Sequence, residues 1–318
     1  MRSFVLWYEP RERIDEKIKL EIHINLWKKR DCIETFVFDF GLLVDKIDLV
    51  ENIYMYLPFK GSKWSDLGHI VSSDTKLVEG IFNENCEIST FHPKRLKISY
   101  KQDAHNEFIL YSLSDEDIKK EEYSNGELLI LKVGNILNAS EKEENQGIDK
   151  IKKYYFRFRI EVEKRKTFLI KEIDSNGNLF IDLFSRTETI DFRINDIRSC
   201  SEKIMEEFYR NKRFCIRKIH YLLLRNFSDE FIYYDGEVSS RILEKELWRR
   251  YIADVPEDAV AYHIKEKTND EKGIETFSKL VRFRYEKTSW FRIFIIFIVS
   301  SIISYTLEKG ICFLFTSK

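Results

Sequence analysis

Apolar and polar residues alternate along the first long patterned segment of the chain, Lys17–Leu26. Every second position is a branched aliphatic residue, and the positions between are charged or polar. The aliphatic positions are Ile18, Leu20, Ile22, Ile24 and Leu26. A period of two places the two sets on opposite faces of a β-strand. The segment therefore predicts a strand with one buried face.

Short segments rich in β-branched and aromatic residues follow through the first 190 or so positions, and each predicts a strand. They are Cys32–Gly41, Asn52–Phe59, Lys94–Tyr100, Glu107–Leu113, Glu127–Gly134, Lys152–Val162, Thr167–Ile173 and Asn178–Phe184. Asn-Gly pairs within Tyr123–Glu127 and Asp174–Asn178 predict hairpin turns. The pattern is typical of an antiparallel, sandwich-like β domain. A mixed α/β domain is the alternative, because Asp66–Phe82 between strands is compatible with helices.

The pattern changes near Phe192, after which apolar residues recur at steps of three and four. Ile194–Phe227, Ser239–Asp254 and Glu275–Lys287 are therefore predicted helices. The fold class that follows is β-rich α+β. Residues 1–192 form a β-rich sensor or binding domain, 193–287 form a helical connector, and 288–318 form a C-terminal segment.

The C-terminal segment is the most apolar part of the chain. Ile293–Leu307 is an uncharged run of 15 residues, about 22 Å as a helix, and Trp290–Phe315 extends it to about 39 Å. The longer window matches a hydrocarbon core of about 30 Å if it tilts. It predicts a single transmembrane helix, with a buried C-terminal helix as the alternative.

Flanking charge gives the predicted orientation of that helix. Four basic residues precede it, and only Lys318 lies beyond its end. The four are Lys279, Arg282, Arg284 and Lys287. The positive-inside rule then predicts a bacterial inner-membrane protein whose N-terminal domain is cytoplasmic. The five scattered cysteines agree with a reducing compartment.

Composition and motifs indicate a protein that is not an enzyme. The 318 residues carry 53 basic and 54 acidic side chains, so no global field attracts nucleic acid or lipid. Phosphate-binding loops, nucleophile elbows and zinc-protease motifs are absent from the sequence. The six histidines are far apart along the chain, and no cofactor or metal site is predicted. An enzyme with an unfamiliar site remains an alternative, built from Asp39, Asp66, His69 and Glu84.

Two basic segments are candidate ligand-binding surfaces. In the strand at Lys152–Lys166, one face carries Lys153, Tyr155, Arg157 and Arg159. Basic groups beside an aromatic ring can bind phosphates and stack a base. Arg213 and Arg217 extend the candidate site on the second segment, which is predicted to be helical. The alternative for both is an ordinary solvated face balanced by nearby acidic residues.

The C-terminal helix carries a polar stripe. Residues spaced by four fall on one side of a helix, and here they are Ser300, Ser304, Glu308 and Cys312. Charges within a membrane normally face a partner or water, and small hydroxyl residues favour close helix packing. The stripe predicts a homo-oligomer with a pore or helix interface. A plain tail anchor that ends near Leu307 is the alternative.

The layout resembles the Hailong membrane effectors of bacterial anti-phage signalling systems. The segments that carry the resemblance are Phe38–Phe59, Asp66–Val71 and Gly80–Glu84, together with the C-terminal segment. The family implies a partner nucleotidyltransferase that makes a nucleic-acid oligomer. That oligomer holds the effector closed, and its loss during infection opens a membrane channel.

The expected function is therefore that of an anti-phage membrane effector. It would be an oligomeric ion channel or membrane-disrupting pore, gated by a nucleotide, an oligonucleotide or the partner nucleotidyltransferase at its cytoplasmic domain. The alternative is a tail-anchored scaffold that is not an enzyme and recruits a partner protein to the inner membrane.

Overall fold

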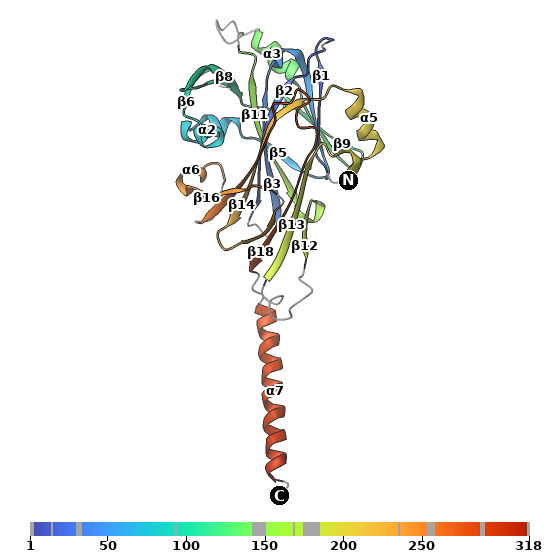
Figure 1. The fold of residues 1–318 in the computed structure, drawn as a ribbon, viewed down its shortest axis with the longest axis vertical. Coiled ribbons are helices and arrows are strands. Elements are labelled where there is room, and N and C mark those ends of the chain that lie inside the picture. Colours follow the sequence, from blue (N-terminus) through green and yellow to red (C-terminus); the bar gives the residue numbers. More distant parts are fainter. Residues whose placement is uncertain are drawn as a thin grey trace.

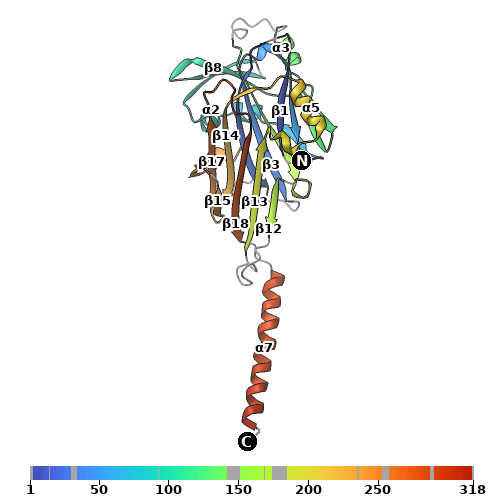
Figure 2. The same ribbon diagram turned by 45° about the vertical axis from the view of Figure 1, so that its right-hand side comes forward.

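Strands dominate the fold, and they form three sheets in one elongated body (Figures 1 and 2). The computed structural model describes residues 3–13, 15–29, 34–92, 94–141, 151–167, 169–173, 185–234, 236–252, 258–286 and 290–316. The chain is thus β-rich, as the alternating segments predict. The predicted hairpin turn at Asp174–Asn178 lies outside the described residues.

The largest sheet has ten strands and runs through the centre of the body. Its order is β16 (Ser239–Ile242), β17 (Ala259–Lys267), β14 (Cys215–Asn226), β2 (Lys19–Lys29), β3 (Thr35–Val44), β11 (Tyr154–Glu163), β8 (Asp103–Tyr111), β7 (Arg95–Tyr100) and β6 (Cys86–His92). The tenth strand, β5 (Lys63–Asp66), also pairs with β11. Two pairs, β14 with β2 and β11 with β8, are parallel, so the sheet is mixed and not purely antiparallel.

Two four-stranded sheets complete the strand architecture. One has the order β1 (Val5–Pro10), β4 (Val50–Leu57), β10 (Gly126–Leu131) and β9 (Ile118–Tyr123). The other has the order β12 (Ile170–Ile173), β13 (Ser185–Ile194), β18 (Phe277–Glu286) and β15 (Glu230–Tyr234). The predicted turn within Tyr123–Glu127 is confirmed, since it joins β9 to β10.

The main hydrophobic core lies between the large sheet and the two smaller ones. Aliphatic positions of β2 are buried there, which confirms the alternation predicted for this strand. Phe4 contacts Phe40 with ring centroids 5.1 Å apart, and Phe192 stacks on Tyr221 at 4.6 Å. Aromatic pairs of this kind add to the stabilisation from buried apolar area. One face of the large sheet is therefore fixed by packing.

Short helices cover part of the opposite face of the large sheet. They are α1 (Gly68–Ser72), α2 (Thr75–Phe82) and α6 (Lys245–Trp248). Leu77 and Trp248 pack there with Val37 of β3 in a second buried cluster. The two helices α1 and α2 fall within Asp66–Phe82, where the mixed α/β alternative places helices. Elsewhere, α5 (Glu202–Arg210) packs on β1, and α3 (Val133–Glu141) lies beside β4.

The predicted helical connector at 193–287 is wrong. Only α5 and α6 are α-helical among its described residues, whereas β14 to β18 supply strands to two of the sheets. The central strand β14 is covered on both faces, so Leu222 and Leu224 add apolar positions to the face opposite Tyr221 and Leu223. Apolar residues on both faces obscure a period of two and produce a spacing that resembles a helix.

The C-terminal segment forms the helix α7 (Trp290–Thr316), which extends away from the strands in both views (Figures 1 and 2). Within the described part of the chain, no helix combines the length and the apolarity needed to cross a membrane. The predicted transmembrane helix and inner-membrane location are therefore wrong. The charge-free run measures only about 22 Å against a hydrocarbon core of about 30 Å, and Glu308 and Lys309 end it.

Candidate functional site

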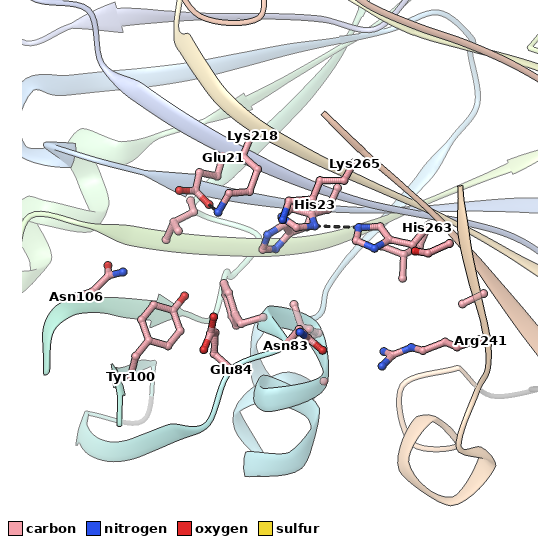
Figure 3. A pocket seen from close by; sticks show the side chains of 18 of the residues that line it. Glu21, His23, Asn83, Glu84, Tyr100, Asn106, Lys218, Arg241, His263 and Lys265 are labelled. Carbon is pink, nitrogen blue, oxygen red and sulfur yellow. Dashed lines mark hydrogen bonds and ion pairs between the residues drawn. The ribbon is translucent and has the colours of Figure 1, made fainter. Parts of the chain in front are cut away.

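An open cleft of about 630 Å³ lies on the helix-covered side of the large sheet. We call it the histidine cleft, because three histidines form its wall on β2, β14 and β17 (Figure 3). The opposite wall comes from the end of α2 and its following turn, the β7–β8 hairpin, and β16. Sites for small ligands commonly occupy about 300–1,000 Å³, so the cleft has a suitable size.

Strand register brings the three histidines into one row. His23 of β2 lies directly opposite His220 of β14, and His263 of β17 lies one strand further. The ring centroids are 4.9 Å apart for the first two and 5.1 Å apart for the last two. Nδ1 of His220 is 3.0 Å from Nε2 of His263, and Nδ1 of His23 is 3.1 Å from the Tyr155 hydroxyl. Hydrogen bonds thus join His220 to His263 and His23 to Tyr155, whereas His23 and His220 meet through an edge-to-face ring contact.

The environment keeps this row neutral. Burial lowers the pKa of His23 well below its usual value, and His220 lowers it further. Burial, followed by the nearby His263, lowers the pKa of His220 to about 3. Burial and then Lys265 lower the pKa of His263. At neutral pH the three rings thus act as hydrogen-bond donors and acceptors and not as cations.

The row predicts a loss of stability in acid. In the unfolded chain these histidines bind protons below about pH 6.5, whereas their lowered folded-state pKa values keep them neutral. Stability is therefore complete above about pH 6.5 and falls as the pH drops toward 3. Each histidine contributes a slope of up to about 1.4 kcal/mol per pH unit between its unfolded-state pKa and its lowered folded-state pKa.

Urea unfolding between pH 7.5 and 4.5 measures this dependence. We expect His220→Gln to reduce the slope. Equal slopes in the wild type and His220→Gln would contradict the conclusion that the histidine row is neutral in the folded protein.

Basic residues exceed acidic ones around the histidine row. The basic lining residues are Lys153, Lys218, Arg241 and Lys265, and the acidic ones are Glu21 and Glu84. Lys218 is paired with Glu21 at 3.0 Å, and Lys153 donates to Asn106 at 3.0 Å. Arg241 and Lys265 are exposed and make no hydrogen bond or ion pair with the described residues. The end of the cleft next to His263 is therefore positively charged.

Aromatic and amide groups line other parts of the cleft. Phe82, the last residue of α2, packs edge-on to His23 at 5.2 Å and to Tyr155 at 4.8 Å. Tyr100 and Asn106 lie together at the end away from Arg241 (Figure 3). Burial raises the pKa of Tyr100, so its phenol stays protonated and can donate a hydrogen bond. The cleft thus joins a basic end to an aromatic, amide-bearing end, where Asn106 holds the ammonium group of Lys153.

Three of the predicted ligand residues belong to a buried network beneath the cleft. Arg157 is 1% exposed and donates to the hydroxyls of Tyr155 at 2.8 Å and Tyr251 at 2.7 Å. Arg159 donates to both carboxylate oxygens of Asp39, at 2.7 and 3.0 Å. Their prediction as ligand contacts is corrected, because Tyr251 and its neighbours after α6 cover this face.

That network leaves no room for a side chain at position 41 of β3, which is a glycine. A Cβ atom at Gly41 would lie 2.0 Å from the Tyr155 hydroxyl and 2.9 Å from Nη1 of Arg157. Glycine there lets the phenol and the guanidinium cross the strand and reach the floor of the cleft. The hydrogen bond between Tyr155 and His23 depends on this close approach.

The other predicted ligand residues separate in space. Lys153 does line the histidine cleft. Arg213 instead lies over the rings of Phe208 and Tyr209, 5.8 Å from each centroid, and Arg217 donates to the carbonyl oxygen of Asp270. The predicted site therefore contributes one residue to the cleft. The histidine row, Arg241 and Lys265 were not predicted. One signal was present, because Lys218, His220 and Leu222 occupy alternate positions, which is the spacing of one face of a strand.

The predicted polar stripe lies on α7, away from the cleft. Ser300 and Ser304 are exposed, as is Glu308, and Ser300 Oγ donates to the carbonyl oxygen of Phe297 at 2.9 Å. The side chain of Cys312 lies outside the described residues. Their role at a helix interface stays a prediction, whereas the predicted pore falls with the transmembrane helix.

The residues of the alternative enzyme site do not form one centre. Asp66 pairs with His69 at 3.1 Å, Asp39 pairs with Arg159, and Glu84 lines the histidine cleft. The described residues contain no group of three histidine, cysteine or acidic side chains placed to hold a metal ion.

No protein-family model matches the chain. No curated protein matches it in sequence.

Proposed function

We propose that the chain is a binding module, and not an enzyme, that takes an anionic nucleotide or short oligonucleotide in the histidine cleft. The observation that carries the proposal is the pair Arg241 and Lys265, two cations without a protein partner among the described residues, beside a row of neutral histidines. A phosphate at this end would supply the missing negative charge.

Electrostatics favours an anion at this end of the cleft. Arg241 and Lys265 lie close enough to His263 to disfavour its protonated form. Phosphate oxygens accept charge-assisted hydrogen bonds from guanidinium and ammonium groups. A bound phosphate would also accept hydrogen bonds from imidazole N–H groups, and the partly enclosed setting would strengthen both kinds of contact.

The remaining lining favours a nucleotide over a simple phosphate. Tyr100 and Phe82 offer aromatic surface, and base–aromatic stacking contributes about 1–3 kcal/mol per base. Asn83, Gln102 and Asn106 offer amide donors and acceptors for base edges. A ligand with phosphate at one end and a planar polar ring at the other would use both ends of the cleft.

The resemblance to Hailong effectors gives this proposal a source for the ligand. In that family a partner nucleotidyltransferase makes a nucleic-acid oligomer, and such a product carries both phosphates and bases. We propose an anti-phage role in which this chain binds the oligomer or its enzyme. The alternative role as a recruiting scaffold stays a prediction.

Fluorescence anisotropy with 5′-labelled, mixed-sequence deoxyoligonucleotides of two to six residues tests the proposal on the full chain. We expect saturable binding that weakens as salt rises, since counterions are released when basic groups meet phosphates. Unlabelled oligonucleotides should compete, and uncharged methylphosphonate analogues should not. Failure of every oligonucleotide and mononucleotide to bind would overturn the proposal.

A further inference from the structure

We propose that the histidine cleft selects a base that presents N–H donors, guanine above all, through the carboxylate of Glu84. The inference rests on the proposed function and names the class of base that the cleft takes. It starts from a feature that phosphate binding leaves unexplained, namely a second carboxylate in a cleft with excess positive charge.

The two carboxylates of the cleft differ in their partners. Glu21 accepts a hydrogen bond from Lys218 at 3.0 Å, so its charge is balanced within the protein. The Glu84 side chain is exposed and has no hydrogen bond or ion pair with the described residues. A free carboxylate would repel a phosphate in its vicinity. Glu84 therefore suits the part of the ligand that carries hydrogen-bond donors.

The backbone holds Glu84 at this position. Asn83 ends α2 with a positive φ of 53°, a left-handed conformation that asparagine adopts readily at helix ends. The turn is fixed further on, where the Cys86 N–H donates to Glu79 and the Cys86 thiol donates to the Glu84 carbonyl oxygen. Figure 3 shows Glu84 between Asn83 and Tyr100, with Arg241 on the far side of Asn83.

This order of side chains separates two subsites along the cleft. Arg241 lies on β16 opposite Ala261 of β17, and Lys265 lies four residues further along β17, opposite His220. The two cations thus flank His263, and the three side chains form the phosphate end. Tyr100 and Glu84 form the base end, where a ring stacked on the phenol would have its edge near the carboxylate.

Hydrogen-bond chemistry determines which base fits a carboxylate. An ionised carboxylate only accepts hydrogen bonds, and it binds best to two parallel N–H donors. Guanine offers the adjacent N1–H and N2–H donors. Adenine and cytosine each offer one amino group beside a ring nitrogen that is an acceptor. Uracil and thymine flank their single N–H with two carbonyl oxygens, which a carboxylate repels.

Calorimetric titration of the full chain with the four ribonucleoside 5′-monophosphates tests the inference at constant phosphate charge. We expect GMP to bind most tightly, UMP to bind at least about fivefold more weakly, and AMP and CMP to fall between. Inorganic phosphate, as a fifth probe, should bind most weakly because it reaches only the basic end.

The matched variants are Glu84→Gln and Glu206→Gln, the second at an exposed glutamate on α5 outside the cleft. Glu84→Gln should reduce the GMP to UMP ratio toward one, whereas Glu206→Gln should keep it. Equal binding of all four nucleotides by the wild type, or a preference for GMP that survives Glu84→Gln, would overturn this inference and leave the proposed function standing. No binding by any of the four mononucleotides would overturn this inference, and the proposed function would fall only if the oligonucleotides also failed to bind.

Discussion

Replacing Asp39 by alanine is expected to lower the free energy of unfolding by about 3–5 kcal/mol. Asp39 is fully buried and accepts two hydrogen bonds from Arg159, whose side chain is only 11% exposed. Loss of the carboxylate leaves a guanidinium without its partner in a poorly hydrated site. Unfolding in guanidinium chloride, followed by tryptophan fluorescence, measures the change. Trp27 is a suitable probe because its ring lies 4.8 Å from the guanidinium group of Arg159.

An exposed ion pair provides the matched control for Asp39→Ala. Glu122 pairs with Lys60 at 2.7 Å, but its side chain is 74% exposed. Solvent screens such pairs, so Glu122→Ala should change the free energy of unfolding far less than Asp39→Ala does. If Asp39→Ala proved as mild as Glu122→Ala, the buried network would not support the floor of the cleft.

Reversing charge at Arg241 and Lys265 together is expected to weaken oligonucleotide binding by about a hundredfold or more. Each residue would lose a hydrogen bond to a charged group, and such bonds contribute about 1.5–3 kcal/mol each. The variant combines Arg241→Glu with Lys265→Glu and is compared with the wild type by anisotropy. Both side chains are exposed, so the fold should tolerate the change.

A second double variant separates the cleft from general surface charge. Arg249→Glu with Lys171→Glu makes the same change in net charge at two exposed residues outside the cleft lining. We expect it to weaken binding far less, through long-range electrostatics alone. Equal losses in the two double variants would show that binding is not located in the histidine cleft.

Local pattern was sufficient to predict several strands and their inward faces. The alternation around Ile22 correctly predicts the buried face of β2, because this strand has one strongly apolar face. The polar face of β11 was predicted to be a ligand-binding or solvated surface, and this prediction is wrong. Tyr155 and Arg157 are buried because a helical layer covers them, and an individual strand carries no record of what packs on its second face.

The histidine row could not be predicted from the sequence for a related reason. His23 and His220 are almost 200 positions apart, and they meet through a parallel pairing of β2 with β14. The same sequence around His220 was predicted to be helical, so this pairing had no place in the expected fold. Strand pairing and register bring these residues together. Predicting such a site therefore requires knowing which strands are neighbours, and composition does not give that information.

The most direct test of the account is a crystal structure of the full chain bound to a 5′-phosphorylated dinucleotide. The account predicts phosphate density within hydrogen-bond distance of Arg241 and Lys265, a base stacked on Tyr100, and its edge facing Glu84. A dinucleotide bound elsewhere on the surface, with the histidine cleft empty, would contradict it.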